Sequence, residues 1–180
     1  PLAKSYDLLT PSFAKKGIRN IFSNLDDVKV TVNDVLQLKF DQAAADFGRF
    51  AINSTVGVGG LFNVAGQAFG LKKNREDFGQ TLAFYGVGAG PHIVLPFFGP
   101  SNLRDTLSMS ADWGISSYAY ENLYQVDLTL SQRILLRAFK EVNYFSLNLG
   151  IYQSIKQDAF DLYLFLRDSY EQKRLTEINQ

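Results

Sequence analysis

The chain has 180 residues, the size of one domain with a core large enough to fold without disulfides or a structural metal. Its 18 Lys and Arg residues balance its 18 Asp and Glu residues, which argues against nucleic acid as the main partner, because phosphate binding needs a surplus of cations. Hydrophobic residues at 46% and charged residues at 20% exclude disorder, and the absence of Cys together with a single His excludes thiol chemistry and the usual zinc clusters.

The first third of the chain predicts helices. Apolar spacing predicts one helix over 12–23, capped by Ser12, and a second over 28–38 that follows the acidic pair Asp26 and Asp27. The pair lacks the ligand spacing of a calcium loop, so we interpret it as a helix-start feature favoured by the dipole. We expect Asp41 to cap a helix through about residue 52, and a short helix over 62–69 to end at Gly70.

The middle third is poor in charged residues and rich in glycine. Residues 50–103 contain five of the 36 charged residues and ten of the 14 glycines. The polar residues, glycines and prolines in this window argue against a transmembrane helix. Two interpretations remain: a buried core region, or a segment that touches lipid or lines a cavity. Over 82–100, the glycines predict two short extended arms around a turn, a hairpin-like loop near 84–96 with an apolar tip.

The last third predicts two further helices. We expect Ser131 to cap the first, which has an apolar stripe at Ile134, Leu135, Ala138, Phe139, Val142 and Phe145. The last helix is expected to start at Asp158, with Asp161 three residues on. Its turn over 162–166 is apolar nearly all round and is expected to be buried on more than one side, while residues 171–180 fray.

Motifs for common chemistry are missing. The GVGAG stretch at 86–90 has Pro91 where a dinucleotide-binding loop needs its third glycine. The sequence lacks a G-x-S-x-G nucleophile elbow, the motif that would present a serine for His92 to activate. A hydrogen-bonded or interfacial histidine is therefore favoured over a catalytic one. Trp113 and the tyrosines near it suit a membrane interface, and core packing explains them about as well.

Four segments resemble one family in the same order along the chain. They are GIRNIFSNLDD (17–27), RFAINSTVGVGGLFNVA (49–65), FGQTLAFYGVGAGPHIVLPFFGPSNLRD (78–105) and DAFDLYLFLRDSYEQKR (158–174). In these segments the chain resembles the MlaA/VacJ family of outer-membrane phospholipid-transport lipoproteins. It departs from the family pattern at Val28, Asn63, His92 and Ala159.

The resemblance implies an all-α, ring-like single domain over 1–180 that lies in the inner leaflet of the outer membrane, on its periplasmic face. It implies passage of phospholipid mislocalised in the outer leaflet through an amphipathic channel, with a trimeric porin and a periplasmic lipid carrier as partners. Neither nucleic acid, a metal, a cofactor nor a catalytic residue is expected. The family anchor is a lipidated N-terminal Cys, which is expected upstream of Pro1 together with the family's first segment.

Within that framework, residues are assigned hypothetical roles. The lipid path is expected to be bordered by Tyr85, Gly86, Val87, Gly88, Gly90, Pro91, His92 and Leu95. Phe97, Phe98 and Trp113 are expected to face the membrane, and Asn53, Ser54, Thr55 and Gln80 the lipid head group. Arg49, Arg104 and Asp105 are interpreted first as structural ion pairs rather than as lipid contacts. Two alternatives stay open: a lipid-modifying hydrolase that uses His92, and a porin-binding structural scaffold.

Overall fold

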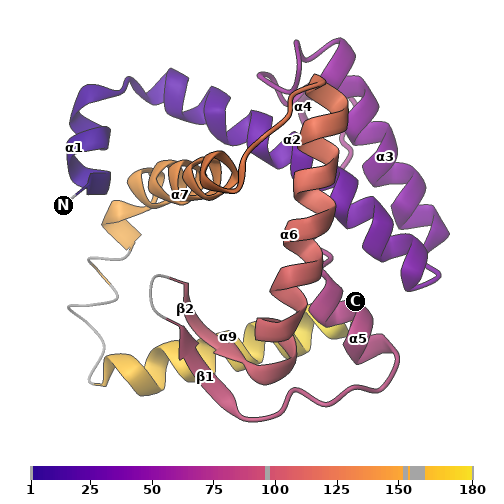
Figure 1. Cartoon of the computed structure of the whole chain (residues 1–180), viewed down its shortest axis with the longest axis vertical. Helices are drawn as coiled ribbons and strands as arrows, with labels where there is room; N and C mark the ends of the chain where they lie inside the picture. The colour runs from indigo at the N-terminus through magenta and orange to yellow at the C-terminus, as the bar shows by residue number, and fades with distance from the viewer. Residues whose placement is uncertain (1, 96–97, 152–153, 155–160, 180) are drawn as a thin grey trace.

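The computed structural model describes residues 2–95, 98–151, 154 and 161–179. Its helices are arranged around a ring, with one small antiparallel sheet on the ring's edge (Figure 1). The described elements are α1 (Leu2–Leu9), α2 (Ser12–Leu36), α3 (Phe40–Thr55), α4 (Val64–Ala68), α5 (Phe78–Phe84), β1 (His92–Leu95), β2 (Gly99–Asn102), α6 (Leu103–Tyr124), α7 (Leu130–Leu147) and α9 (Leu162–Ile178). The all-α, ring-like expectation is therefore confirmed.

Helix α2 is a single helix, so the expected division into 12–23 and 28–38 was wrong. The stretch between those ranges contains neither Gly nor Pro, and nothing in it breaks the helix. Asp26 and Asp27 lie in the middle of α2 instead of at a helix start, and their carboxylates are paired with Lys140 and Lys73. Cations from other elements thus replace the helix dipole as the partners of this acidic pair.

The observed helix starts differ from several expected ones. Helix α2 follows Pro11 without a side-chain cap, and α3 starts at Phe40, which places Asp41 within its first turn. Thr129, rather than Ser131, caps α7, because it forms a reciprocal capping box with Gln132.

Two other helices have N-caps that the sequence analysis did not assign. Asn63 caps α4, where the backbone N–H of Gly66 donates to its side chain, and Gly70 follows with φ of 67°. Asp161 caps α9, whereas the expected start at Asp158 lies outside the described residues. Helices α1, α5 and α6 were not expected from the sequence.

The hairpin is displaced along the chain from its expected place. Strands β1 and β2 pair antiparallel from His92 opposite Asn102 to Leu95 opposite Gly99, so both strands follow Gly86, Gly88 and Gly90 instead of flanking them. Residues 86–91 form an irregular segment that bonds to the start of α6: the carbonyl of Ala89 accepts from the backbone N–H of Arg104, and that of Pro91 from Leu103. These bonds, together with those from the backbone N–H groups of Gly86 and Val87 back to the carbonyls of α5, hold the segment in place.

The ring is polar inside and apolar outside. Only five hydrophobic residues of the described chain are buried (Leu25, Val30, Ala43, Ala65 and Ala119), against 21 polar or charged ones. The accessible surface is 11174 Å², whereas a compact monomer of 20.2 kDa exposes about 8,800 Å². The large apolar side chains therefore lie mainly on the exposed surface.

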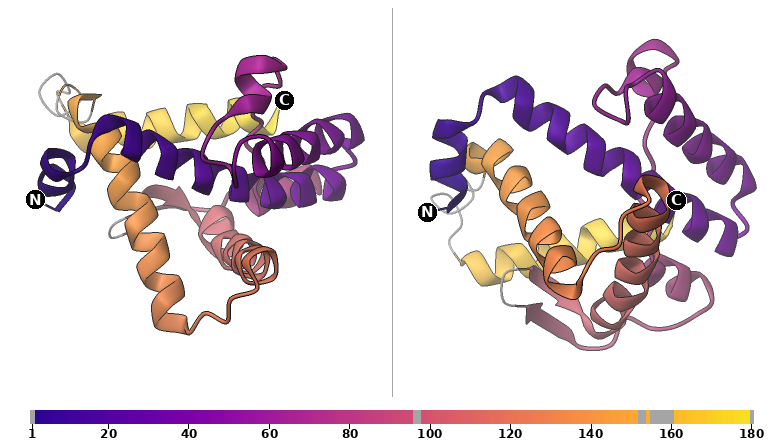
Figure 2. Two further views of the ribbon diagram at one scale, coloured as in Figure 1. Left: turned by 90° about the horizontal axis from the view of Figure 1, so that it is seen from above. Right: turned by 45° about the horizontal axis from the view of Figure 1, so that its top comes forward.

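This polarity contradicts one expectation about the last third, the burial of the 162–166 turn. The apolar stripe of α7 is exposed, with Leu135 at 67%. The 162–166 turn also exposes Tyr163, Leu164 and Phe165, although burial was expected. Helix α9 continues to Ile178 with Arg174 buried, so the expected fraying from residue 171 was wrong. Figure 2 shows that α7 and the 125–129 connection project from one side of the ring.

A buried acidic pair lies between α2 and α3. Asp34 and Asp46 are both fully buried, and neither carboxylate oxygen of Asp34 has a hydrogen-bond partner among the described residues. Burial, followed by repulsion from Asp46 and Glu76, raises the pKa of Asp34 to about 7. The folded protein therefore binds a proton here that the unfolded chain releases near pH 4.

We predict that Asp34→Asn stabilises the protein at high pH. The stabilisation from protonated Asp34 is complete below about pH 4 and is lost as the pH rises through about 7. The neutral amide removes this loss, so the variant should gain up to about 4 kcal/mol at pH 8 and little at pH 4. Urea unfolding in detergent at several pH values measures the difference. Exposed Asp41→Asn serves as the control; an equal, pH-independent effect in both variants would contradict the assignment.

Candidate functional site

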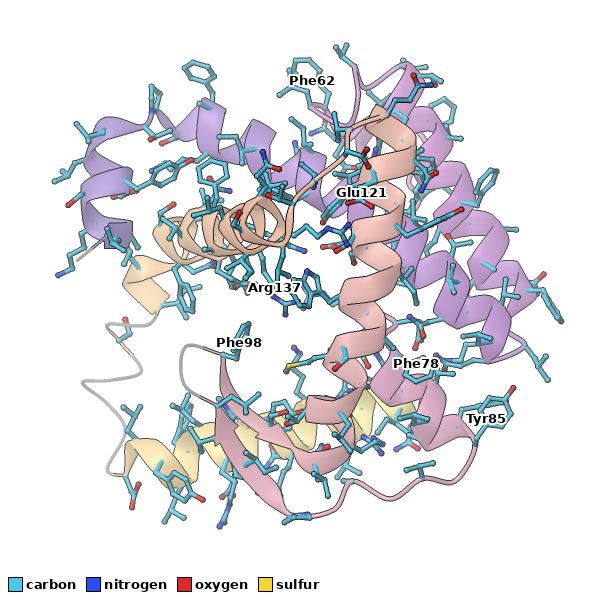
Figure 3. All side chains as sticks on the ribbon, viewed as in Figure 1. Phe62, Phe78, Tyr85, Phe98, Glu121 and Arg137 are labelled. Carbon is cyan, nitrogen blue, oxygen red and sulfur yellow. The ribbon has the colours of Figure 1, made fainter. Side chains whose placement is uncertain are left out.

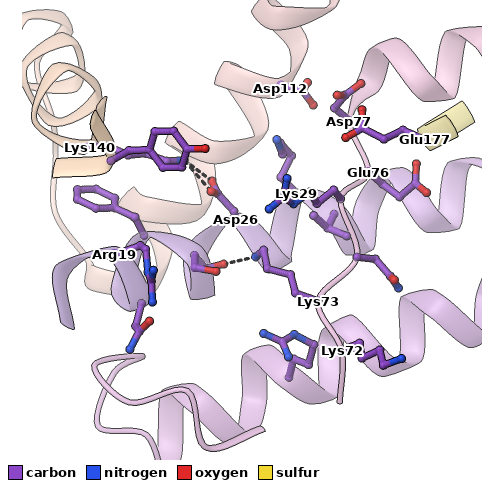
Figure 4. Close-up of a pocket in the computed structure, with 18 of the residues that line it drawn as sticks. Arg19, Asp26, Lys29, Lys72, Lys73, Glu76, Asp77, Asp112, Lys140 and Glu177 are labelled. Carbon is purple, nitrogen blue, oxygen red and sulfur yellow. Dashed lines mark hydrogen bonds and ion pairs between the residues drawn. The ribbon is translucent and has the colours of Figure 1, made fainter. Parts of the chain in front are cut away.

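A cavity of about 1010 Å³ lies on the inner side of the ring. It is lined by α2, the 63–67 and 70–77 segments, α6, α7 and α9, with Arg49 of α3, and most of its lining side chains are polar or charged (Figure 4). A second cavity of about 220 Å³ lies between α2, α6 and α7. The two share the lining residues Phe22, Asp26, Lys29, Asp77, Met109, Asp112, Lys140 and Glu141. We call these eight residues the junction.

Ion pairs between distant segments form much of the cavity wall. Lys140 on α7 binds both carboxylate oxygens of Asp26 on α2 at 2.7 Å, as Figure 4 shows. Lys73 pairs with the fully buried Asp27 and also donates to the carbonyl of Ser23 at 2.6 Å. Arg49 lies 3.5 Å from Asp27, so this carboxylate has cations on two sides. Burial nevertheless raises the pKa of Asp27.

Arg174 on α9 clamps two other elements at the cavity's edge. Its guanidinium donates to both oxygens of Asp77, before α5, at 2.7 and 3.0 Å, and its Nε donates to Asp105 of α6 at 2.8 Å. The hydroxyl of Tyr170 also donates to Asp105, at 2.6 Å. Burial alone would raise the pKa of Asp105, but the hydrogen bonds from Arg174 and Tyr170 outweigh it and lower that pKa to about 2. Both carboxylates are therefore ionised at neutral pH.

Other charges in the cavity are not neutralised by the protein. Among the described lining residues, four cations have neither an ion pair nor a side-chain hydrogen bond: Arg19, Lys29, Lys72 and Arg75. One lining carboxylate, that of Glu141, is in the same state. The cavity thus presents a net excess of unpaired positive charge, suited to an anionic group such as a phosphate. Within the described residues, no three His, Asp or Glu side chains are arranged to hold a metal ion.

The residues expected on the head-group side do not line either cavity. Asn53 is buried, and its side-chain oxygen accepts from the backbone N–H of Ala65 at 2.9 Å. Ser54 accepts from Asn24 at 2.8 Å, and Thr55 donates to its own helix backbone. Gln80 is buried on α5 and donates to the carbonyl of Arg75 at 2.6 Å. These four polar side chains stabilise helix ends and connections.

The residues expected along the lipid path lie at the ring's edge, outside both cavities. Tyr85 is exposed and donates from its hydroxyl to the carbonyl of Leu36 at 2.7 Å. Gly86 and Gly90 adopt left-handed φ values of 84° and 70°, whereas Gly88 does not. The carbonyl of Val87, itself half-exposed, accepts from Arg104 at 3.2 Å. Pro91 and Leu95 stand at the start of the hairpin and at the end of β1.

His92 contacts α9. Its Nδ1 lies 3.6 Å from a carboxylate oxygen of Glu171, and its ring packs against Tyr163 and Tyr170 at 6.2 and 6.1 Å between centroids. Neither ring nitrogen has a hydrogen-bond partner among the described residues. Within that part of the chain, no Ser, Thr or other nucleophile is therefore paired with this imidazole, which packs as an aromatic side chain between sheet and helix.

The expected membrane-facing residues have different positions. Phe98 is half-exposed and reaches toward the ring's opening, where the guanidinium carbon of Arg137 on α7 lies 5.1 Å above its ring (Figure 3). Trp113 lines the smaller cavity instead of projecting outward. Phe97 lies outside the described residues.

Sequence reasoning missed the charged cavity residues. Lys29, Glu141 and Arg137 lie on the polar faces of helices, where a solvent-exposed position is the ordinary interpretation. The signal that could have found them was the exposed apolar stripe on the same helices: if the apolar face meets lipid, the charged face must line the interior. The ion-pair interpretation of Arg49, Arg104 and Asp105 agrees with the geometry.

Known proteins resemble this chain over most of its length. The family model described as MlaA lipoprotein matches residues 1–177. A protein of Rickettsia bellii is 34% identical over 175 residues, which cover 97% of this chain and 66% of that protein. The intermembrane phospholipid transport system lipoprotein MlaA of Escherichia coli is 40% identical over 114 residues, covering 62% of this chain and 45% of that protein.

A solved structure described as "Structural basis for maintenance of bacterial outer membrane lipid asymmetry" superposes with a TM-score of 0.82. The two chains are 29% identical, and the match covers 99% of this chain and 86% of the other. The matched part of the chain spans about two thirds of the length of the Rickettsia bellii protein and about half that of the Escherichia coli protein.

We predict that Arg174→Gln destabilises the ring severely. It leaves the carboxylate of Asp77 without its cation and that of Asp105 with Arg104 alone, which should cost about 3 kcal/mol. The cost of Arg174→Lys should lie between zero and that of Arg174→Gln, because one ammonium cannot bind both carboxylates in the same geometry. Lys173→Gln removes a pair of 3.4 Å whose lysine side chain is 59% exposed, and should cost at most about 0.5 kcal/mol. Unfolding of the three variants in detergent measures the order, and equal costs would contradict the clamp.

Proposed function

The chain belongs to the MlaA lipoprotein family, and from this we propose that it passes phospholipid through its ring without altering it. In the full proposal, phospholipid mislocalised in the outer leaflet of the outer membrane enters the cavity and leaves toward a periplasmic lipid carrier. The transfer maintains lipid asymmetry, in keeping with the phospholipid transport named for the Escherichia coli relative.

One observation supports the proposal above the others: the ring is polar inside and apolar outside. A phospholipid has a charged head and apolar tails, so its movement across a membrane needs a polar path for the head while the tails stay in hydrocarbon. A polar cavity of about 1010 Å³ beside an apolar exterior meets both requirements. The unpaired cations Arg19, Lys29, Lys72 and Arg75 would attract the phosphate along this path.

The exterior supports a position within one leaflet. Exposed large hydrophobic side chains occur on α1, α3, α7 and α9, and elsewhere, with Leu8, Phe13 and Leu135 among the most exposed. Such a surface is an interaction surface for membrane or protein. In the described part of the chain, no helix combines the length and the hydropathy needed to cross a bilayer. We propose that the ring lies in the inner leaflet of the outer membrane, on its periplasmic face.

We propose that residues 85–95 border the entrance of the lipid path. The segment ends at the hairpin whose Phe98 meets Arg137 across the ring's opening. The head-group role passes from Asn53, Ser54, Thr55 and Gln80 to the cavity cations, because those four side chains bind backbone or neighbouring side chains instead. Phe97 and Phe98 are proposed to meet acyl chains, and Trp113 to line the inner wall.

We propose no enzymatic step. His92 has no nucleophile within hydrogen-bonding distance among the described residues, and its Glu171 neighbour stands 3.6 Å from Nδ1. A trimeric porin and a periplasmic lipid carrier are proposed as protein partners, with an N-terminal lipid anchor on the longer protein. Residues 1–180 are proposed to act as one domain. The transfer experiment below distinguishes this lipid-passing function from that of a porin-binding scaffold that moves no lipid.

We predict that the full-length, lipidated protein in liposomes transfers intact labelled phospholipid to a soluble lipid-carrier acceptor. Lys29→Glu should lower the transfer rate about tenfold, because it replaces an unpaired cation of the junction by an anion that repels phosphate. Mass spectrometry of both fractions identifies the product.

The matched control is Lys16→Glu, an exposed residue of the same helix outside both cavities. Equal loss in both variants would contradict passage through the cavity. Lysophospholipid or free fatty acid would show a hydrolase, and transfer that is absent even with porin trimers would favour the scaffold.

We predict that Gly90→Ala slows transfer and Gly88→Ala does not. Gly90 has φ of 70°, and a Cβ there would lie 3.1 Å from the Cβ of Leu103, so alanine strains the segment by about 1 kcal/mol. Gly88 faces open space without a left-handed φ. The same assay should show a loss of up to about fivefold for the first variant alone. Identical rates would mean that the segment's position does not control entry.

A further inference from the structure

We propose that the junction of the two cavities is a receptor for a zwitterionic head group, a phosphodiester that carries a primary ammonium. The inference rests on the proposed function and specifies its substrate: phospholipids of the phosphatidylethanolamine class should pass in preference to anionic ones. Its basis is a pair of opposite charges at the junction that the described protein leaves without partners.

Glu141 is the acidic member of this pair. Every other carboxylate lining the larger cavity has a partner in the described structure: Asp26 binds Lys140, Asp77 binds Arg174, and Asp112 accepts from the backbone N–H of Phe78 at 3.1 Å. Glu76, Asp105 and Glu177 are also paired. Glu141 lines both cavities, is half-buried and has neither a hydrogen bond nor an ion pair among the described residues. A carboxylate in this position can bind an ammonium group.

Lys29 is the basic member. It also lines both cavities, and its side chain has no hydrogen bond or ion pair among the described residues. Its charge acts to lower the pKa of Asp77 and that of Asp112, although burial raises the pKa of Asp112 overall. Figure 4 shows Lys29 on the cavity wall between Asp26 and Asp112. Because the Lys29 ammonium has no ion pair to break, it can donate hydrogen bonds to a phosphate.

Arg137 extends the basic side into the smaller cavity. Its Nε is buried without a hydrogen-bond partner among the described residues, and its guanidinium lies over Phe98. Arg137 and Glu141 are four residues apart on α7, a spacing that usually permits an ion pair, yet the two side chains are not paired with each other. Charges of both signs therefore remain available along one helix face for a ligand that itself carries both.

This arrangement discriminates between head groups by their cation. The ammonium of phosphatidylethanolamine would pair with Glu141 while Lys29 and Arg137 hold the phosphate. Phosphatidylglycerol has no cation, so it would leave Glu141 unpaired beside its own negative charge. We expect the protein to transfer the zwitterionic lipid faster than the anionic one.

The test uses the full-length, lipidated protein in liposomes of equal phosphatidylethanolamine and phosphatidylglycerol content with a soluble lipid-carrier acceptor. Glu141→Gln should lower phosphatidylethanolamine transfer about fivefold and leave phosphatidylglycerol transfer unchanged or raised. Lys29→Gln should lower both. Asp127→Asn, an exposed carboxylate outside both cavities, is the control and should leave the ratio of the two lipids unchanged.

The outcomes separate this inference from the proposed function. A protein that transfers both lipids, with a ratio that Glu141→Gln does not alter, would overturn the receptor and leave transport intact. A protein that transfers neither lipid would overturn the proposed function itself. Circular dichroism and thermal unfolding of each variant show whether a loss of transfer is a loss of folding. If Glu141→Gln unfolds, Glu141→Asp, which shortens the carboxylate but keeps the charge, should lower the ratio without reversing it.

A last arm distinguishes a lipid from a free head group. Water-soluble glycerophosphoethanolamine, added in excess to the aqueous phase, has the same charges but no tails to hold it in the membrane. We expect it to leave the lipid ratio unchanged. Inhibition confined to phosphatidylethanolamine transfer would assign the junction to a water-soluble phosphodiester and overturn its assignment to a lipid.

Discussion

The fold depends on neutralising carboxylates that lie inside a ring with almost no apolar core. Asp27, Asp77 and Asp105 are each bound by a cation from a segment far away in the sequence. The one guanidinium of Arg174 connects α9 both to Asp77, the N-cap of α5, and to Asp105 of α6. An isolated buried carboxylate is strongly unfavourable, so each pair forces its two segments together. Where ordinary globular proteins use apolar packing, this ring uses charge to fix which helix lies beside which.

The same constraint explains why the cavity suits a lipid head group. The charged side chains that connect the helices are neutralised in ion pairs, as with Asp26 and Lys140. Charges such as Lys29 and Glu141 are left over, and they line the space between the helices. Outside, the apolar faces of the same helices remain uncovered by protein. A molecule with a charged head and apolar tails matches both environments at once.

The sequence predicted the class of the fold and its family better than the positions of individual residues. Long periodic segments such as α3 and α7 were recognised, because their apolar spacing does not depend on tertiary structure. The single helix α2 was divided in two, since the partners that neutralise Asp26 and Asp27 come from residues 114 and 46 positions away. The hairpin was misplaced for a similar reason: the glycine segment bonds to α6 and not to itself. The cavity was missed because burial rules for water-soluble proteins assign charged faces to solvent, and here they face inward.

The division between charged side chains that are ion-paired and those that are not has an evolutionary consequence. A substitution at Asp105 or Arg174 breaks a network that spans three elements, so these positions are constrained by folding. The side chains of Lys29, Arg75 and Glu141 make no ion pair or hydrogen bond with the described residues, so other residues can replace them without destabilising the ring. Lineages that face different lipid compositions can therefore change the cavity's charge one residue at a time, on a scaffold that stays the same.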